Sequence, residues 1–93
     1  MSGHLLRPCK STAAFEALPQ QGKYHAQLDL ANCQKALLDL GYQEVADAKV
    51  MIVMKKEIEV TIYPSAKLIL KTDSRDVAEQ TMIEIYDKIL IEK

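Results

Sequence analysis

The sequence predicts an α+β domain in which a curved antiparallel sheet of three to five strands has two main helices packed on one face. Three observations predict this class. Short runs of alternating apolar residues lie between positions 50 and 71, and segments with helical periodicity precede and follow them, at 28–40 and 73–90. A chain of 93 residues is expected to form one compact domain. We assign residues 23–93 to it and treat residues 1–22 as a partly irregular N-terminal segment.

The N-terminal segment has the weakest pattern. Pro8 and Pro19 interrupt it, and Gln20-Gln21-Gly22 is typical of a loop. A short helix is expected from Thr12 to Leu18, although a helix of this length needs tertiary packing to persist. The rest of the segment is expected either to be flexible or to add one strand near Leu5-Leu6.

The first clear element is an amphipathic helix within residues 28–40. Apolar side chains recur there with three-four spacing at Leu30, Cys33, Leu37 and Leu40, and Gly41 ends the pattern, since glycine is favoured just past a helix end. The next segment, Tyr42 to Lys49, is expected to be a connection, with a short strand as the alternative.

Three strands are predicted at 50–55, 57–63 and 67–71, joined by turns at Lys55-Lys56 and Pro64-Ser65-Ala66. Residues of one parity are apolar and β-prone, as expected for a face that packs on the core. These residues are Val50, Ile52, Met54, Ile58, Val60, Ile62, Leu68 and Leu70.

The opposite parity predicts an interaction surface. Charged residues lie toward the ends of these strands, whereas the middle contains Met51, Val53, Thr61, Tyr63 and Ile69. If the helices cover only the other face, these five side chains form an exposed, largely apolar patch. Contiguous patches of that kind usually mark a site of association. Either the N-terminal segment folds over this patch or another chain covers it.

A long helix is predicted after Thr72. Asp73 or Ser74 is its candidate N-cap, and acids follow in the first turns, where the positive end of the helix dipole favours them. One side of this helix is apolar and is expected to lie across the core face of the sheet. Its residues are Val77, Ala78, Thr81, Met82, Ile85 and Ile89, whereas Ile83 and Leu90 lie on another side.

Charge and hydropathy exclude several classes of protein. Twelve Lys and Arg residues against thirteen Asp and Glu give a net charge of -1, so any nucleic-acid binding would need a local basic patch. The longest apolar runs fall far short of a bilayer span, and the N-terminus has no hydrophobic signal core. We therefore expect a soluble, cytoplasmic protein that does not insert into membranes.

Metal binding and catalysis are not supported by the spacing of reactive residues. His4, Cys9, His25 and Cys33 have the right chemistry for zinc, but structural zinc sites bring two ligands within a few residues of each other. Cys9 lies between Arg7 and Lys10, which would lower its thiol pKa, yet no general base accompanies it. We expect no enzyme activity, no metal and no cofactor.

Two other candidates have simpler explanations. Ser65 is typical of a turn, and no histidine lies near it in the sequence. Glu57 and Glu59 point the same way on one predicted strand, but a glycosidase pair also requires a concave pocket and one carboxyl group with a raised pKa. Both carboxylates are therefore expected to solubilise the rim of the sheet.

Residues 28–93 resemble one of the two repeats of the TATA-box-binding protein family. The similarity is clearest in KVMIVMKKEIEVTIYPSAKLILKTDSRDVAEQTMIEIYDKIL at 49–90. There, Ile62-Tyr63 matches a strand end with an aromatic residue, 64–67 matches a corner of the SSGK type, and 71–74 matches the turn into the last helix. The resemblance implies the family's half-saddle fold, in which a strand and a helix precede the sheet and a long helix follows it.

The family's sheet binds the DNA minor groove and wedges pairs of Phe between base steps. Tyr63 matches one wedge position, but Asp47-Ala48 has no aromatic residue at the other. Val53 replaces a family arginine, Ala66 replaces the corner glycine, and Glu57 and Glu59 would face phosphates. These departures argue against DNA bending of the TATA type.

Three functional hypotheses follow. The first is a small non-enzymatic interaction module whose open sheet face associates with a second copy, giving a homodimer, or with a protein partner. The second is weak nucleic-acid binding by Lys55, Lys67 and Lys71, with Tyr63 as a stacking platform. The third is an enzyme that uses Cys9.

Overall fold

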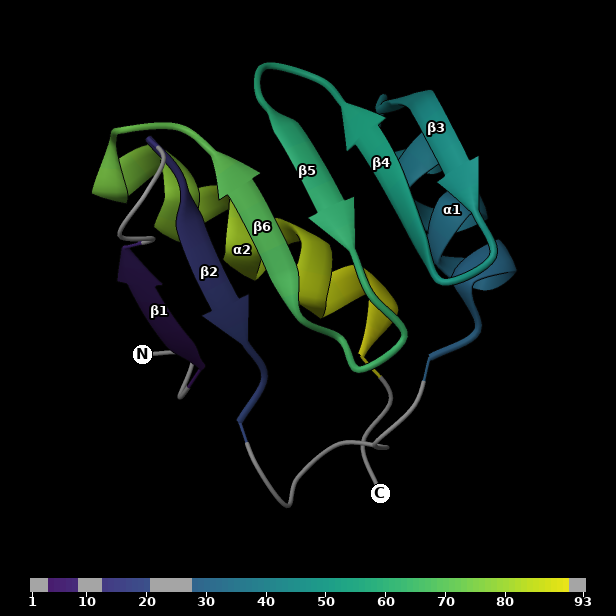
Figure 1. The fold of residues 1–93 in the computed structure, drawn as a ribbon, viewed down its shortest axis with the longest axis horizontal. Coiled ribbons are helices and arrows are strands. Elements are labelled where there is room, and N and C mark those ends of the chain that lie inside the picture. The colour runs from purple at the N-terminus through teal and green to yellow at the C-terminus, as the bar shows by residue number, and fades with distance from the viewer. Residues whose placement is uncertain (1–3, 9–12, 21–27, 91–93) are drawn as a thin grey trace.

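The chain forms an open antiparallel sheet of six strands and two helices (Figure 1). The computed structural model describes residues 4–8, 13–20 and 28–90. In chain order the elements are β1 (Leu5–Pro8), β2 (Phe15–Leu18), α1 (Leu30–Asp39), β3 (Gln43–Ala48), β4 (Met51–Lys55), β5 (Glu59–Ile62), β6 (Leu68–Lys71) and α2 (Arg75–Ile89). The strand order is β1-β2-β6-β5-β4-β3, and the α+β class is confirmed. The expected three to five strands were too few.

The extra strands come mainly from the N-terminal segment. The strand expected near Leu5-Leu6 is β1, whereas the helix expected from Thr12 to Leu18 is wrong, because Phe15–Leu18 forms β2 and pairs with both β1 and β6. Phe15 and Ala17 alternate into the core, at 9% and 0% exposure. Pairing with two strands satisfies the backbone of this segment on both sides, which a single isolated helical turn could not do.

Helix α1 follows the predicted amphipathic pattern. The carboxylate of Asp29 caps it by accepting a hydrogen bond from the Ala31 backbone N–H at 3.0 Å, and Cys33 and Leu37 are its buried residues. Gly41 follows the helix with a φ of +96°, a conformation that glycine adopts readily. Strand β3 then occupies the segment for which a connection was the first expectation. All six of its residues are exposed, and its pairing with β4 shifts between Glu44 and Ala46.

Strands β4, β5 and β6 form the predicted meander. Val53 pairs with Thr61 and Thr61 pairs with Ile69, so side chains of equal parity line up across all three strands. Most of the predicted core face is fully buried, with exposures of 0–1%, namely Ile52, Met54, Val60, Ile62, Leu68 and Leu70. Two residues differ. Val50 is 69% exposed because it precedes β4 in a turn, and Ile58 is only half-buried because it lies in the bend before β5.

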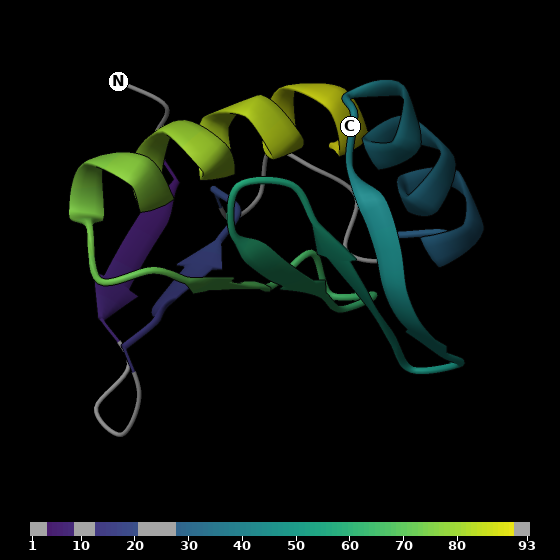
Figure 2. The ribbon, with the colours of Figure 1, turned by 90° about the horizontal axis from the view of Figure 1, so that it is seen from above.

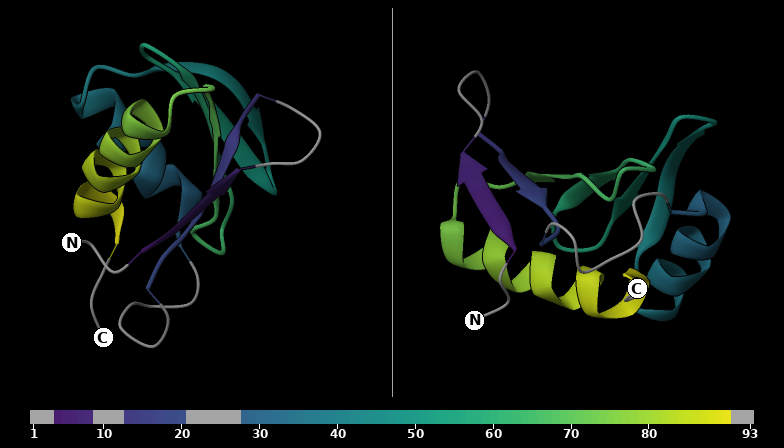
Figure 3. Two further views of the ribbon diagram at one scale, coloured as in Figure 1. Left: turned by 90° about the vertical axis from the view of Figure 1, so that its left-hand side faces the viewer. Right: turned by 90° about the horizontal axis from the view of Figure 1, so that it is seen from below.

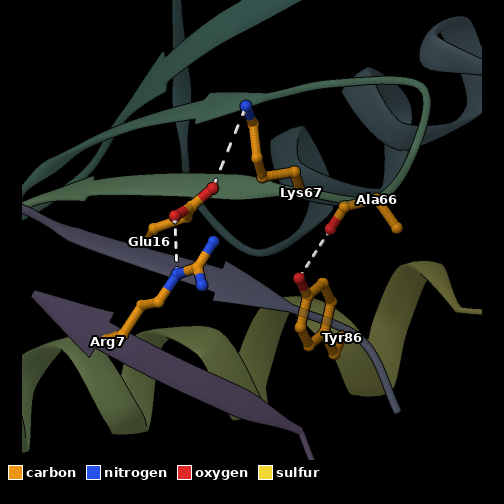
Figure 4. A network of polar contacts seen from close by, with 5 residues as sticks. All are labelled: Arg7, Glu16, Ala66, Lys67 and Tyr86. Atoms are coloured by element: carbon orange, nitrogen blue, oxygen red, sulfur yellow. Dashed lines mark hydrogen bonds and ion pairs between the residues drawn. The ribbon is translucent and has the colours of Figure 1, made fainter. Parts of the chain in front are cut away.

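Hydrogen bonds within the turn and from α2 fix the turn between β5 and β6. Its Ala66 N–H donates to the Tyr63 carbonyl at 2.9 Å, and the Tyr63 N–H donates to the Lys67 carbonyl at 3.0 Å. Ala66 has a φ of +71°, which is unusual for a residue with a side chain, and that side chain is buried. The hydroxyl of Tyr86 in α2 donates to the Ala66 carbonyl at 2.6 Å and ties this turn to the helix (Figure 4).

Helix α2 lies across the core side of the sheet, as predicted. Ser74 is its N-cap and accepts from the Val77 N–H at 3.3 Å. Its buried residues are Ala78, Met82, Ile85, Tyr86 and Ile89, while the predicted Val77 and Thr81 are half-buried. Figures 2 and 3 show α1 and α2 together on one side of a twisted sheet. No element from the described residues covers the opposite side in these views.

Candidate interaction surface

The open face is the side of the sheet opposite the two helices. We define its central members as the five residues predicted from sequence, Met51, Val53, Thr61, Tyr63 and Ile69, together with Leu5 and Leu18 from the N-terminal strands. The first five are all half-buried, and so is Leu18, whereas Leu5 is 49% exposed. Half-burial is expected where side chains contact neighbours along the sheet but have no second layer above them.

Strand register places these residues in rows that run across the sheet. One row joins Arg7, Glu16, Ile69, Thr61, Val53 and Ala46 through consecutive cross-strand pairs. Ile69, Thr61 and Val53 form its uncharged middle, in which Ile69 and Val53 are apolar. A second row joins Lys71, Glu59, Lys55 and Gln43. The open face therefore has an apolar centre with a charged row along one side.

Sequence reasoning missed the contribution of β1 and β2 to this face. Arg7 and Glu16 lie opposite each other, and Leu5 lies opposite Leu18. The alternation of Phe15, Glu16, Ala17 and Leu18 was a signal for these positions. The interpretation of residues 12–18 as a helix hid it.

The cations on the open face are largely paired with carboxylates on the same face. Glu16 lies between Arg7, at 2.9 Å, and Lys67, at 4.0 Å (Figure 4). Lys71 contacts Glu59 at 2.9 Å. Lys55, in contrast, forms no ion pair within the described residues. Among the predicted nucleic-acid contacts, Lys67 and Lys71 are thus partly neutralised, and Lys55 is the cation that remains available.

The ring of Tyr63 is also in contact with a side chain of the same molecule. The Lys67 Nζ lies 4.5 Å from the centroid of the Tyr63 ring, within the range of a cation–π contact. One side of the ring is therefore occupied by an ammonium group. A nucleic-acid base that stacked on that side would have to displace it.

Reactive groups on the helix side do not form a catalytic arrangement within the described residues. Burial, followed by the negative charge of Asp29, raises the pKa of the Cys33 thiol to about 11, so the thiol is protonated at neutral pH and is a poor nucleophile. The Nδ1 of His4 accepts from the Gln20 N–H, and its ring contacts Tyr86 edge-on at 4.7 Å. Cys9 and His25 lie outside the described residues. Within the described part of the chain no group of His, Cys, Asp and Glu could hold a metal ion.

A polar cavity of about 230 Å³ lies between the β4–β5 turn and α2. Tyr42, Lys56, Glu57 and Glu84 are among its lining residues. The Tyr42 hydroxyl donates to Glu84 at 3.5 Å, and Lys56 lies 3.9 Å from the same carboxylate oxygen. Burial and the Glu84 charge raise the pKa of Tyr42 to about 12, so this phenol is neutral at physiological pH and cannot act as a general base.

Glu57 and Glu59, which the sequence placed together on one strand, differ in position. Glu57 lies in the bend before β5 and lines the polar cavity, whereas Glu59 lies in β5 and pairs with Lys71. Ser65 is exposed in the β5–β6 turn.

Comparisons with known protein families, with curated proteins and with solved structures found no match. A search of the described helices found none with the length and apolar character needed to cross a membrane.

Proposed function

We propose that this protein is a small non-enzymatic interaction module whose open face associates with a second copy or with a protein partner. One observation carries the proposal. Met51 and Val53 in β4, Ile69 in β6 and Tyr63 just after β5 are half-buried on the face that no described helix covers. Apolar groups at such positions gain their full burial when another surface covers them.

We further propose that the fold is a single half of the kind found in the TATA-box-binding protein family. The order of elements supports it, because β2 and α1 precede the four-strand meander β3 to β6 and α2 follows. Strand β1 is an addition to that order. The likeness concerns architecture, and the absence of an aromatic residue at Asp47-Ala48 argues against the family's wedge mechanism here.

The edges of the sheet are less suited to association than its face. Strand β1 has four residues and ends at Pro8, which lacks a backbone N–H. Strand β3 carries Glu44 and Asp47 and has an irregular register next to Val45. Short length, proline, charges and bulges are the features by which natural proteins discourage pairing at edge strands. These features favour contact through the open face.

Photo-crosslinking in the host cell tests the proposal whatever the identity of the partner. A photoreactive residue at Thr61, in the middle of the open face, should give one discrete cross-linked species. The same residue at Glu79, on α2, is the matched control and should give none. Sedimentation of the purified chain then decides whether the partner is a second copy. Equal cross-linking at both positions, or none at Thr61, would contradict the proposal.

Weak nucleic-acid binding is the second candidate. The observation in its favour is the charge of the open face, where the described cations Arg7, Lys55, Lys67 and Lys71 outnumber the carboxylates Glu16 and Glu59. Retention of the purified chain on single- and double-stranded oligonucleotides tests it, since electrostatic affinity is greatest at low salt. Absence of retention at low ionic strength would exclude this candidate.

A further inference from the structure

We infer that the partner of the open face is an acidic amphipathic helix of another protein, lying across the strands. The inference rests on the proposed function and specifies the partner's chemistry. It draws on two features of the described residues. These are the spacing of the row formed by Ile69, Thr61 and Val53 and the distribution of charge beside that row.

The spacing of the residues in this row suits a helix that lies across the strands. Ile69, Thr61 and Val53 lie side by side on β6, β5 and β4. Neighbouring strands are about 4.8 Å apart, and one turn of an α-helix rises about 5.4 Å. A helix that crosses the strands can therefore place one apolar side chain per turn over each strand. Roughly ten residues would span the distance from β2 to β4, about 14 Å.

The charged row indicates that the partner carries negative charge on the flank that faces it. Lys71 and Lys55 stand on either side of Glu59, two strands apart. This separation is about 9.6 Å, close to the rise of about 10.5 Å between helix residues seven apart. Carboxylates at positions i and i+7 on one flank of the helix would meet both lysines. Lys55 is the stronger of the two contacts, since it has no ion pair within the described residues.

The charge of the open face also favours an acidic helix over a second copy of the chain as the partner. The open face has more cations than carboxylates, so two open faces in contact would bring like charges together. The described surface of α2 has the opposite balance, with Asp76, Glu79, Glu84 and Asp87 against Arg75 and Lys88. However, the apolar side of α2 is already buried in its own core. Helix α2 of another copy therefore has no apolar stripe to offer.

Nucleic acid fits the open face less well than a helix does. Its phosphates would meet Glu16 and Glu59 beside the lysines, and Lys67 already covers one side of the Tyr63 ring. An acidic helix needs no stacking platform. It could leave a neutral residue opposite Glu59.

Binding of two designed peptides to the purified chain tests the inference. The first is a helix-stabilised peptide with Leu at i, i+4, i+7 and i+11 and Glu along one flank, and the second has Lys in place of each Glu. The acidic peptide should bind about tenfold more tightly than the basic one or better, given two ion pairs at the rim of an apolar contact. Its affinity should fall as salt is added. Backbone amide shifts should map to β4, β5 and β6 and spare α2.

Charge reversal provides the matched control. The double variant Lys55→Glu with Lys71→Glu should invert the preference between the two peptides. The variant Lys35→Glu with Lys88→Glu, which makes the same charge change on the helices, should leave the preference unchanged. Lys55→Glu alone is a second test, because it breaks no ion pair in the described structure. Unfolding midpoints confirm that each variant is folded.

Several outcomes would overturn the inference. These are equal binding of both peptides, tighter binding of an oligonucleotide than of the acidic peptide, and self-association through Thr61. If the Thr61 cross-link to another protein persists while the acidic peptide fails to bind, the inference is wrong and the proposed function stands. If neither is seen, both are wrong.

Discussion

The two faces of β4, β5 and β6 are built from alternate residues of the same strands but obey different constraints. On the helix side, every side chain from these strands is apolar and has no more than 1% exposure. On the open side, apolar residues and ion pairs share the surface and none is fully buried. Burial in the core is sufficient to explain why the residues of the first face are apolar. The apolar residues of the second face call for another reason, which we take to be association.

The largest predicted difference is in the free energy of unfolding that is lost when one residue on each face is truncated. Leu68→Ala removes a fully buried side chain and is expected to lower the free energy of unfolding by about 2–5 kcal/mol. Ile69→Ala, one residue further along the same strand, removes a half-buried side chain, and we expect a loss of roughly 1 kcal/mol or less. Urea unfolding of both variants measures the difference. Equal losses would mean that the open face is part of the core of the isolated chain.

The same contrast should hold for tyrosine hydroxyls. The hydroxyl of Tyr86 is buried and donates to the Ala66 carbonyl, so Tyr86→Phe leaves that carbonyl without its donor and should cost about 1–2 kcal/mol. Tyr63→Phe on the open face is the control. No described hydrogen bond uses its hydroxyl, and the expected change is below about 0.5 kcal/mol. A larger loss for Tyr63 than for Tyr86 in denaturant unfolding would reverse the assignment of the two faces.

How much of this contrast the sequence could predict depended on local pattern. The core parity of the meander was readable because its turns and its alternation lie within about twenty residues. Strand β2 was not, since FEAL contains good helix formers and its partner β6 lies some fifty positions away. Strand β3 was ambiguous because an edge strand exposed on both sides shows no alternation. The ion pairs of Glu16 depend on that same distant pairing.

Alkaline pH should destabilise the protein through its helix side. Burial raises the pKa of Tyr86, the pKa of Tyr42 rises to about 12, and that of Cys33 rises to about 11. Each folded pKa lies above its unfolded value, so the folded state binds more protons, and the stability these groups confer is complete below pH of about 9. It is lost as pH rises from there through the folded pKa values.

Denaturant unfolding at a series of alkaline pH values measures this slope. In Tyr42→Phe the loss of stability between about pH 10 and 12 should be shallower than in the parent chain, since one of the groups that titrate there is gone. Tyr63→Phe serves again as the control from the open face. Stability that rises with pH over this range would contradict the assigned sign.

The smallest effect is expected at Ala66, where the strands turn from β5 into β6. Its positive φ is strained for a residue with a Cβ, so Ala66→Gly should relieve about 1 kcal/mol. The same change removes a buried methyl group, worth about 0.8 kcal/mol, and makes the unfolded chain more flexible by about 0.4–1 kcal/mol. The opposing contributions nearly cancel, and we expect a net change within about 1 kcal/mol of zero. Ala66→Val keeps the strained φ and adds bulk at a buried site, so it should destabilise clearly. If urea unfolding shows Gly to be strongly stabilising, the methyl group contributes little to the core, and the buried face ends before this turn.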